Sequence, residues 1–539
     1  TDPQSHATAG KLRTEFCIAV RGLVVPRPEG LVNPKMQTGA IEIEVREVDI
    51  LSASETPVFE LADEIDTNEE TRLQYRFLDL RRRPMQQALL LRHRIAKTIR
   101  DYFDEQGFVE IETPFLTKST PEGARDYLVP SRINPGWFYA LPQSPQLFKQ
   151  LLMMSGFDRY VQIVRCFRDE DLRADRQPEF TQLDVEMSFA NQEMVFRVIE
   201  GMFNSVLCLI GVELPAQWPR MTYAEAMRRY GSDKPDLRFE MELQDLTANL
   251  AGTDFAPFAS VIEAGGEIKA ITVKGKADYS RKQLDELQEF AKRYGAGALA
   301  WIKIGEAETT SSLLKVLGEE KIGELANAAG AEKGDAVLII AGRKPVVAAS
   351  LGALRIEVAK RENLIDRTAY KPLLVTEFPM FELDEESGHY MAAHHPFTSP
   401  MDEDLEMFRI AIEDESQHHL LGNVRAKAYD AVINGYECAG GSIRIHQKEI
   451  QALNFKALGL TPETARERFG FFLDALEFGT PPHGGFAAGI ERTCMILCGT
   501  ENIRDVMAFP KTASAQDLMM DSPGNVDPHQ LDELGIKVV

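Results

Sequence analysis

A charged segment between two alternating runs is the feature that most constrains the fold of this chain. Residues Tyr160–Arg165 alternate apolar and polar side chains, and Phe180–Phe189 alternate again. Alternation with a period of two predicts strands, so the arginine- and carboxylate-rich residues between them form the loop of an antiparallel hairpin. Asp184 and Glu186 then share one face of the sheet. Because buried acids need partners, the hairpin predicts a site for a cationic or polyphosphate ligand. A solvated hairpin with surface ion pairs is the alternative.

The size and composition of the chain limit its class. With 539 residues, of which 44% are hydrophobic, it is too long for one ordinary domain. No apolar run reaches the length of a membrane span, and Thr1–Gln4 lacks the features of a signal peptide. The six cysteines are scattered and lack zinc-ligand spacing. We therefore expect a cytoplasmic protein with reduced cysteines, no zinc and no membrane partner.

Three separated motifs carry a resemblance to a known family. Phe167–Glu170 reads Phe-Arg-Asp-Glu and matches the Phe-Arg-x-Glu signature of motif 2 of the class II aminoacyl-tRNA synthetases. Gly107–Pro114 resembles motif 1, the dimer-interface element with its proline, and Gly484–Arg492 resembles motif 3. The resemblance is strongest to the bacterial aspartyl branch of the family. It extends from about Leu12 to the C-terminal region.

The resemblance implies an α+β fold, in which a class II antiparallel sheet with helices is joined to a partial OB-fold β-barrel and an inserted α+β domain. The expected parts are a partial OB-fold anticodon-binding domain (1–56), a hinge (57–80), a catalytic domain in two pieces (81–238 and 371–520), a bacterial-type insertion domain (239–370) and an irregular C-terminal extension (521–539). The runs Glu15–Val25 and Gly39–Val48 resemble the later strands of the barrel. We expect its earlier strands to be missing through truncation. A naturally reduced domain is the alternative.

The resemblance also implies the residues that activate an amino acid with ATP. An anionic carboxylate must attack an anionic α-phosphate, so the site has to neutralise charge. Arg168 is expected to bridge the two groups and Arg492 to hold the γ-phosphate, which makes them the catalytic residues. The expected ATP-binding residues are Arg168, Asp169, Glu170, Gln177, Phe180 (stacked on adenine), Glu437, Gly489, Ile490, Glu491 and Arg492. Asp430 and Glu437 are expected to hold Mg²⁺, with a surface pair of acids as the alternative.

Recognition of aspartate requires cations. Gln146 and Lys149 are three residues apart at a predicted helix start and so share one face. By resemblance, Lys149 and Arg444 clamp the side-chain carboxylate of the substrate, and the match of residues 143–149 to the aspartyl pattern favours this role over the alternative of a structural ion pair. The full set expected at the aspartate is Glu122 (from a mobile loop), Ser144, Gln146, Lys149, Arg168, Asp184, His394, His395 (in support) and Arg444. The segment 402–421 is acidic and longer than the family pattern.

The function implied by the resemblance is ligation of aspartate to the tRNA for aspartate, by a homodimer with Pro114 near its two-fold axis, with ATP as substrate and Mg²⁺ as cofactor. A non-discriminating form that also charges the tRNA for asparagine is one alternative, and a noncatalytic synthetase-like binding protein is another. The net charge of −23 makes the position of basic residues decisive for RNA binding. The run Arg72, Arg76, Arg81, Arg82, Arg83, Arg92 and Arg94 is therefore either an RNA contact or a solvated helix face.

Overall fold

The computed structural model describes residues 3–34, 36–119 and 123–538. The chain divides into two compact units, one formed by Thr1–Leu90 with Arg504–Asn525 and the other by Leu91–Ile503 with Val526–Val539. Within the described ranges, no helix is both long enough and apolar enough to pass through a bilayer.

The N-terminal part of the first unit is an antiparallel pair of strands, β1 (Cys17–Pro26) and β2 (Ile41–Ser52), with helix α1 (Pro3–Ala9) packed against β2. The two strands confirm the alternating runs predicted from the sequence. This sheet has two strands among the described residues, so the OB-fold barrel stays a prediction.

The predicted hinge contains two short helices, α2 (Glu69–Gln74) and α3 (Arg76–Asp79), whose arginines point inward. The fully buried carboxylate of Asp79 accepts hydrogen bonds from Arg76 (2.6 Å), Arg82 (2.8 Å) and Arg72 (3.1 Å). The prediction of a basic RNA contact or a solvated helix face is therefore wrong for these three residues. The spacing of the three arginines in the sequence does not predict that they share one aspartate as partner.

Arg76 also joins the hinge to the C-terminal segment. Its guanidinium donates to the backbone oxygens of Arg504 and Met507, each at 2.7 Å. This segment, which contains η5 (Ile503–Val506), groups with the hinge from Arg504 onward, whereas the sequence assigned it to the catalytic domain up to residue 520. Helix α4 (Arg83–Glu105) begins with Arg83 and Pro84, because a proline in the first turn is compatible with a helix.

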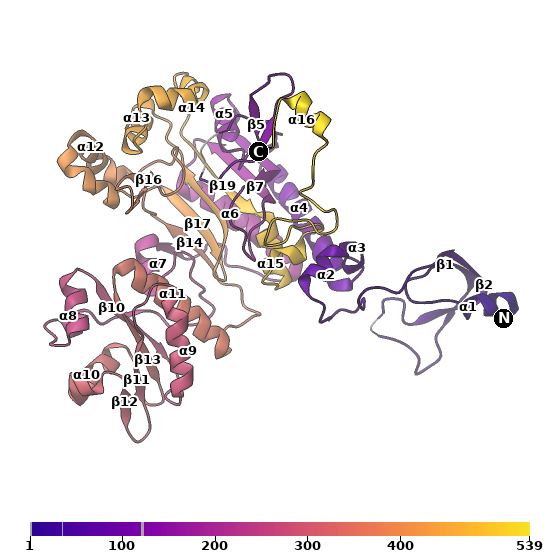
Figure 1. Cartoon of the computed structure of the whole chain (residues 1–539), viewed down its shortest axis with the longest axis horizontal. Helices are drawn as coiled ribbons and strands as arrows, with labels where there is room; N and C mark the ends of the chain where they lie inside the picture. The colour runs from indigo at the N-terminus through magenta and orange to yellow at the C-terminus, as the bar shows by residue number, and fades with distance from the viewer. Residues whose placement is uncertain (1–2, 35, 120–122, 539) are drawn as a thin grey trace. The chain divides into compact units, whose positions relative to one another are not determined.

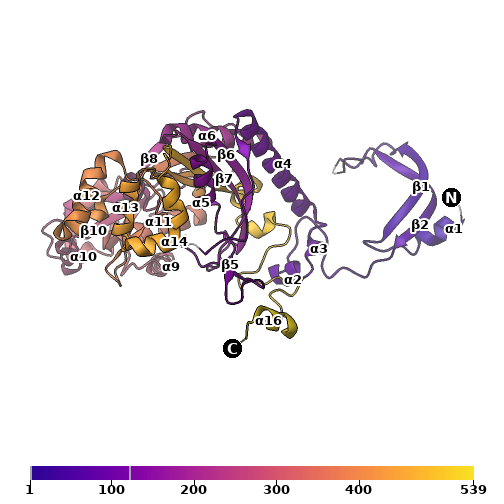
Figure 2. The same ribbon diagram turned by 90° about the horizontal axis from the view of Figure 1, so that it is seen from above.

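The second unit contains a sheet whose strands β7, β14, β17 and β19 are labelled in Figure 1 and whose strands β6, β7 and β8 are labelled in Figure 2. This sheet has eight strands in the order β3-β6-β7-β19-β18-β17-β14-β8. Its strands are β3 (Val109–Glu110), β6 (Arg159–Phe167), β7 (Glu179–Ser188), β8 (Arg220–Thr222), β14 (Pro372–Thr376), β17 (Ala428–Ile433), β18 (Tyr436–Ile443) and β19 (His483–Gly489). All neighbours are antiparallel except β3 with β6 and β14 with β8. The β6–β7 hairpin confirms the prediction from alternation.

Helices and small hairpins surround this sheet. They are α5 (Gln146–Met154), α6 (Gln192–Leu207), η1 (Cys208–Ile210), α7 (Tyr223–Tyr230), η3 (Asp402–Asp404), α12 (Leu405–Glu413), η4 (Glu415–Asn423), α13 (Lys448–Ala457), α14 (Pro462–Leu476), α15 (Ile490–Cys498), and the pairs β4 (Leu128–Pro130) with β5 (Phe138–Ala140) and β15 (Phe381–Leu383) with β16 (Tyr390–Ala392). Helices α5 and α15 both pack against β7.

Helices form in the acidic segment 402–421 and in the C-terminal extension, of which only the extension was predicted to be irregular. The acidic segment 402–421 forms η3, α12 and most of η4, and its Phe408 and Leu421 are buried in one core with Leu373 of β14. The C-terminal extension contains the short helix α16 (Pro528–Leu534), which the prediction of an irregular extension missed. Asp527 caps that helix and Pro528 occupies its first position, a combination that starts helices.

The insertion domain is a five-stranded antiparallel sheet with helices on both faces. Its strands, in the order β12-β11-β13-β10-β9, are β9 (Gln244–Asp245), β10 (Glu267–Val273), β11 (Ala300–Ile304), β12 (Thr309–Ser311) and β13 (Ala336–Gly342), and its helices are η2 (Ala248–Leu250), α8 (Ala256–Glu263), α9 (Arg281–Lys292), α10 (Leu314–Ala328) and α11 (Lys344–Arg361). Leu338 of β13 packs with α9 and α11, whereas its neighbour Val337 packs with α8 and α10. Strand alternation therefore divides the domain into two cores.

Candidate active site

Four charged side chains meet beneath the centre of the eight-stranded sheet. Lys149, on the first turn of α5, places its Nζ 2.7 Å from Asp184 Oδ1 and 3.5 Å from Glu186 Oε2, both carboxylates being on β7. Arg444, just after β18, grips Glu186 through Nε (2.9 Å) and Nη2 (3.1 Å). Each of the four side chains is at most 2% exposed. The two cations predicted to clamp a substrate are thus brought together, and in this structure each pairs with a buried acid.

The electrostatics of this cluster follow from its burial. Burial alone raises the pKa of a carboxyl, but the charges of Arg444 and Lys149 overcome that effect and bring the pKa of Glu186 below its usual range. The guanidinium of Arg444 is stabilised in return, because Glu186 offsets its burial and raises its pKa. The opposite charges of Glu186 and Arg444 therefore stabilise each other in this buried position.

The glycines of motif 3 make room for this cluster. A side chain at Gly485 of β19 would place its Cβ 2.4 Å from Glu186 Oε2 and 2.0 Å from the backbone oxygen of Val185. A side chain at Gly441 of β18 would approach the oxygen of Gly485 to 2.1 Å. Glycine is needed at these positions because a side chain would clash with the neighbouring strand, and its absence lets the strands pack closely beside Glu186.

Two buried polar atoms in the cluster point to the chemistry of a ligand. Among the described residues, neither Asp184 Oδ2 nor Gln146 Nε2 has a hydrogen-bond partner. A buried carboxylate oxygen and a buried amide donor left unpaired each cost free energy. An amino acid satisfies both, since its ammonium group donates to an acceptor such as Asp184 and its carboxylate accepts from a donor such as Gln146.

Four further residues predicted at the aspartate lie in different surroundings. His395 lies beside Arg444, which donates from Nη1 to His395 Nε2 at 2.6 Å, and burial followed by the charge of Arg444 lowers the pKa of His395 well below its usual range. His394 is more solvent-exposed and has its ring edge against Phe378, at a centroid distance of 5.1 Å. Ser144 lies two residues before α5. Glu122 lies outside the described residues.

A cavity of about 200 Å³ lies next to this cluster and is lined by residues of motif 2, β18 and motif 3. Its lining includes the predicted ATP contacts Arg168, Glu170, Gln177, Phe180, Glu437, Gly489, Glu491 and Arg492. The guanidinium of Arg168 lies over the ring of Phe180, 5.1 Å from its centroid. One face of the Phe180 ring is thus covered by a planar cation, and a flat aromatic ring of this kind is also what the predicted stacking of adenine on Phe180 requires.

Arg492 is held at the floor of this cavity where β19 passes into α15. Its Nη1 donates to the backbone oxygen of Glu437 at 2.6 Å, and its Nη2 lies 3.3 Å from Asp175 Oδ2. Strand β19 ends at Gly489 and α15 begins at Ile490, so Arg492 lies in the first turn of the helix.

Glu491 lines the cavity and is also held by neighbouring elements, whereas Asp169 and Ile490 do not line it. The carboxylate of Glu491 accepts from Thr181 N (3.1 and 3.0 Å) and from Arg92 (2.8 Å), so it ties β7 and α4 to α15. Asp169 faces Arg125 at 3.6 Å and does not line the cavity. Ile490 is buried at the start of α15 and is likewise absent from the cavity wall.

The predicted metal ligands lie on one hairpin, and they converge. A side chain at Gly440 would place its Cβ 2.7 Å from Asp430 Oδ1 and 3.3 Å from Glu437 Oε1, so both carboxylates lean over the same glycine of β18. Burial and, second, the neighbouring Glu437 raise the pKa of Asp430 well above its usual range. Two close carboxylates that repel each other fit a hard divalent cation. The described residues contain no cluster of three or more His, Cys, Asp or Glu suited to a metal.

Two residues of the site were not among the contacts predicted for aspartate or ATP. Glu186 links Lys149 to Arg444, and Asp175 holds Arg492. The alternation of β7, which put Glu186 on the face of Asp184, was a signal for the first. Asp175 lies in a loop and carried no periodic signal.

Comparison with known proteins identifies the family. A family model described as tRNA synthetases class II (D, K and N) matches residues 68–513. The chain therefore belongs to the class II tRNA synthetases. It is 55% identical to a protein of Symbiobacterium thermophilum named aspartate--tRNA(Asp/Asn) ligase, over 98% of this chain and 89% of that protein. It is 52% identical to one of Macrococcus caseolyticus named aspartate--tRNA ligase, over 98% and 88%.

Solved structures confirm the class II fold predicted from the sequence. An asparaginyl-tRNA synthetase of Entamoeba histolytica, in complex with asparaginyl-adenylate, matches with a TM-score of 0.55 at 16% identity, over 95% of this chain and 86% of that chain. The asparaginyl-tRNA synthetase of Pyrococcus horikoshii matches with a TM-score of 0.54 at 16% identity, over 94% and 86%. At such identities the likeness concerns the fold alone.

Proposed function

We propose that this chain is an aspartate-tRNA ligase, which activates L-aspartate with ATP and transfers it to tRNA. The observation that carries the proposal is the buried pair of cations, Lys149 and Arg444, beside the unpartnered Asp184 Oδ2. An anionic side chain placed between the cations and an ammonium group placed on Asp184 match the charges of aspartate. Asparagine would leave the cations inadequately paired. The names of relatives that are 55% and 52% identical over the aligned residues support the same assignment.

The proposed reaction has two steps. A carboxylate oxygen of aspartate attacks the α-phosphorus of ATP, the bond to the β-phosphate oxygen breaks, and aspartyl-adenylate and pyrophosphate form. The terminal adenosine hydroxyl of tRNA then attacks the aspartyl carbonyl and releases AMP. Arg168 and Arg492 line the cavity next to the aspartate cluster, where they would neutralise the phosphates and hold the reactants in line. No protein nucleophile is needed.

In this proposal Asp430 and Glu437 hold Mg²⁺, which neutralises phosphate charge when it is bound. Glu437→Gln removes one of two converging charges, so we expect the Mg²⁺ concentration that gives half-maximal ATP–pyrophosphate exchange to rise roughly tenfold or more. Glu477→Gln, which alters an exposed pair with Lys448, is the matched control and should leave that concentration unchanged. Equal Mg²⁺ requirements in the two variants would refute the metal assignment.

The enzyme could charge the tRNA for aspartate alone or the tRNAs for both aspartate and asparagine. Several relatives that are 52–55% identical carry the name aspartate--tRNA(Asp/Asn) ligase, which favours a form that charges both tRNAs. Charging of each purified tRNA with labelled aspartate separates the candidates, because a discriminating enzyme charges one of them. Failure to charge either tRNA and to form adenylate would instead support a noncatalytic binding protein. The cytoplasm stays the expected compartment.

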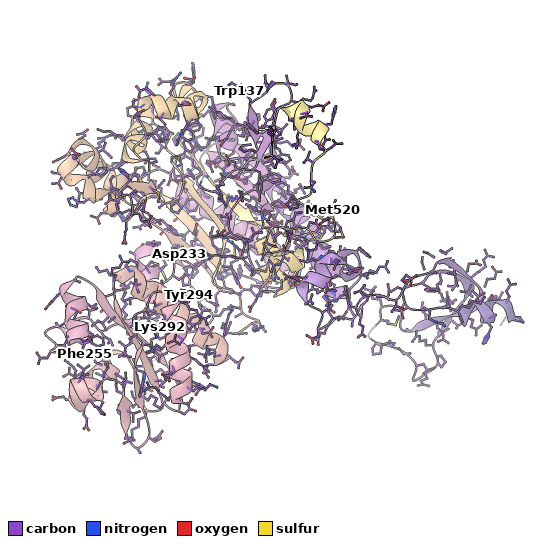
Figure 3. All side chains as sticks on the ribbon, viewed as in Figure 1. Trp137, Asp233, Phe255, Lys292, Tyr294 and Met520 are labelled. Atoms are coloured by element: carbon purple, nitrogen blue, oxygen red, sulfur yellow. The ribbon has the colours of Figure 1, made fainter. Side chains whose placement is uncertain are left out.

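We further propose a homodimer, because motif 1 and the β4–β5 hairpin expose apolar side chains. An isolated bridge between Thr117 and Ala140 joins the two segments. The exposed side chains are Val109, Phe115, Leu116, Leu128, Ile133, Trp137 (labelled in Figure 3) and Phe138. A patch of this kind on a class II synthetase fits a second copy of the chain. Light scattering should give twice the chain mass of 60.4 kDa, and a monomer mass would contradict the proposal.

A further inference from the structure

The insertion domain contacts the hairpin that carries Asp430 and Glu437, and it does so through the two segments that connect it to the catalytic sheet. The incoming segment, residues 231–241, follows α7, and Asp233 lies on it (Figure 3). The outgoing segment, residues 362–371, follows α11 and leads to β14. Both segments reach the turn between β17 and β18.

Both connecting segments contact the β17–β18 turn directly. A side chain at Gly435 would place its Cβ 3.1 Å from the Cβ of Asp236, so the incoming segment packs closely on the turn. On the other side, Asn434 Nδ2 donates to the backbone oxygen of Ala369 at 2.9 Å, and Lys371 N donates to Asn434 Oδ1 at 2.8 Å. The turn is thus held between the entrance and the exit of the insertion domain.

Arg355 of α11 fixes the shape of the incoming segment. This fully buried side chain donates to the backbone oxygens of Asp236 (2.8 Å), Met241 (2.9 Å) and Phe239 (3.0 Å). Its guanidinium also lies over the ring of Phe239, 4.0 Å from the centroid, and over that of Tyr230 at 4.9 Å. A planar group with several donors suits this task, which a lysine cannot reproduce.

Helix α11 meets the start of the same segment at two glycines, Gly352 and Gly231. A Cβ added at Gly352 would lie 2.5 Å from the oxygen of Gly231, and one added at Gly231 would lie 2.3 Å from the oxygen of Ala348. Any added atom must therefore displace backbone, so the contact is sensitive to small movements of the insertion domain.

From these contacts we infer that the insertion domain positions Asp430 and Glu437, with Arg355 as a positioning residue that acts through segment 231–241 and the Asn434–Gly435 turn. Asp430 is four residues before this turn and Glu437 two residues after it, on paired strands. A displaced turn moves both carboxylates relative to Arg492, whose Nη1 is bonded to the backbone of Glu437. The role in ATP and Mg²⁺ handling rests on the proposed function, whereas the mechanical link does not.

The test uses one substitution at two helical glycines of the same domain. Gly352→Ala drives a methyl group against Gly231, and Gly323→Ala in α10 adds the same methyl where no atom lies within 4 Å. Hydrogen exchange without substrates is the first readout. We expect Gly352→Ala to speed exchange in peptides covering 428–443 by about three- to tenfold over Gly323→Ala. Peptides covering β6 should match in the two variants.

Kinetics give the second readout. In ATP–pyrophosphate exchange, Gly352→Ala and Arg355→Lys should raise the KM for ATP about three- to tenfold and leave the KM for aspartate within about twofold. The inference would be overturned if hydrogen exchange became faster only in residues 231–241 and α11 and the KM for ATP stayed unchanged. Should the wild-type protein show no exchange with aspartate, the proposed function fails, and the hydrogen-exchange comparison still decides the mechanical link.

Discussion

Lys149→Leu is expected to lower kcat/KM for aspartate in ATP–pyrophosphate exchange by at least about a hundredfold, because it removes a buried cation from the proposed carboxylate clamp. Asp184 and Glu186 would also lose a partner in a place where the four side chains are at most 2% exposed. Arg444 would remain paired with Glu186, so an incoming carboxylate would meet an excess of negative charge. The effect should fall on aspartate and not on the KM for ATP.

A matched control separates this effect from the cost of losing any buried lysine. Lys269 of β10 is also buried and lies 3.2 Å from Glu267, in the insertion domain. Lys269→Leu should leave the aspartate kinetics within about twofold of the wild-type values, since it changes no group near the substrate. A folded Lys149→Leu variant with wild-type aspartate kinetics would overturn the assignment of the clamp.

The second large effect concerns stability. Asp79→Ala leaves Arg76, Arg82 and Arg72 without their shared carboxylate, and the side chains of the first two are only 3% and 8% exposed. Removing one partner of a buried charge cluster costs about 3–5 kcal/mol, because the remaining charges stay buried. We expect peptides covering 69–82 to exchange hydrogen much faster than in the wild-type protein. Asp285→Ala, which breaks an exposed pair with Arg281, should have little effect.

The same cluster predicts a pH dependence. Burial alone would raise the pKa of Asp79, but its hydrogen bonds from Arg72 and Arg82 outweigh burial and lower that pKa. A carboxyl with a lowered pKa contributes stability above its unfolded pKa, and this contribution disappears as the pH falls through the folded pKa. Protection of residues 69–82 should therefore decline on acidification in the wild-type protein. Asp79→Ala should lack this decline, and equal pH profiles would contradict the account.

Local pattern predicted a large part of the site. Alternation placed Asp184 and Glu186 on one face of β7, and the start of α5 placed Lys149 one turn into a helix, as the structure confirms. These predictions depended on neighbours in sequence, for which backbone geometry fixes the direction of each side chain. The resemblance of the three motifs supplied the remaining assignments.

Partner choice between distant segments was not predictable in this way. Arg444 pairs with an acid 258 positions away, and Arg76 turns inward to Asp79 and to the backbone near Met507. Sequence spacing gives the face of an element on which a charge lies, whereas the fold decides which face is buried. Arg355 illustrates the same limit, since its partners are backbone oxygens 114–119 positions away.

Amino-acid-dependent exchange of pyrophosphate into ATP tests the central claim most directly, because it reports the adenylation site without requiring tRNA. The assay compares aspartate, asparagine, glutamate and lysine on the whole chain. The account predicts exchange with aspartate alone, driven by the pairing of its side chain with Lys149 and Arg444. Exchange with asparagine or lysine at a comparable rate, or no exchange by folded protein, would contradict it.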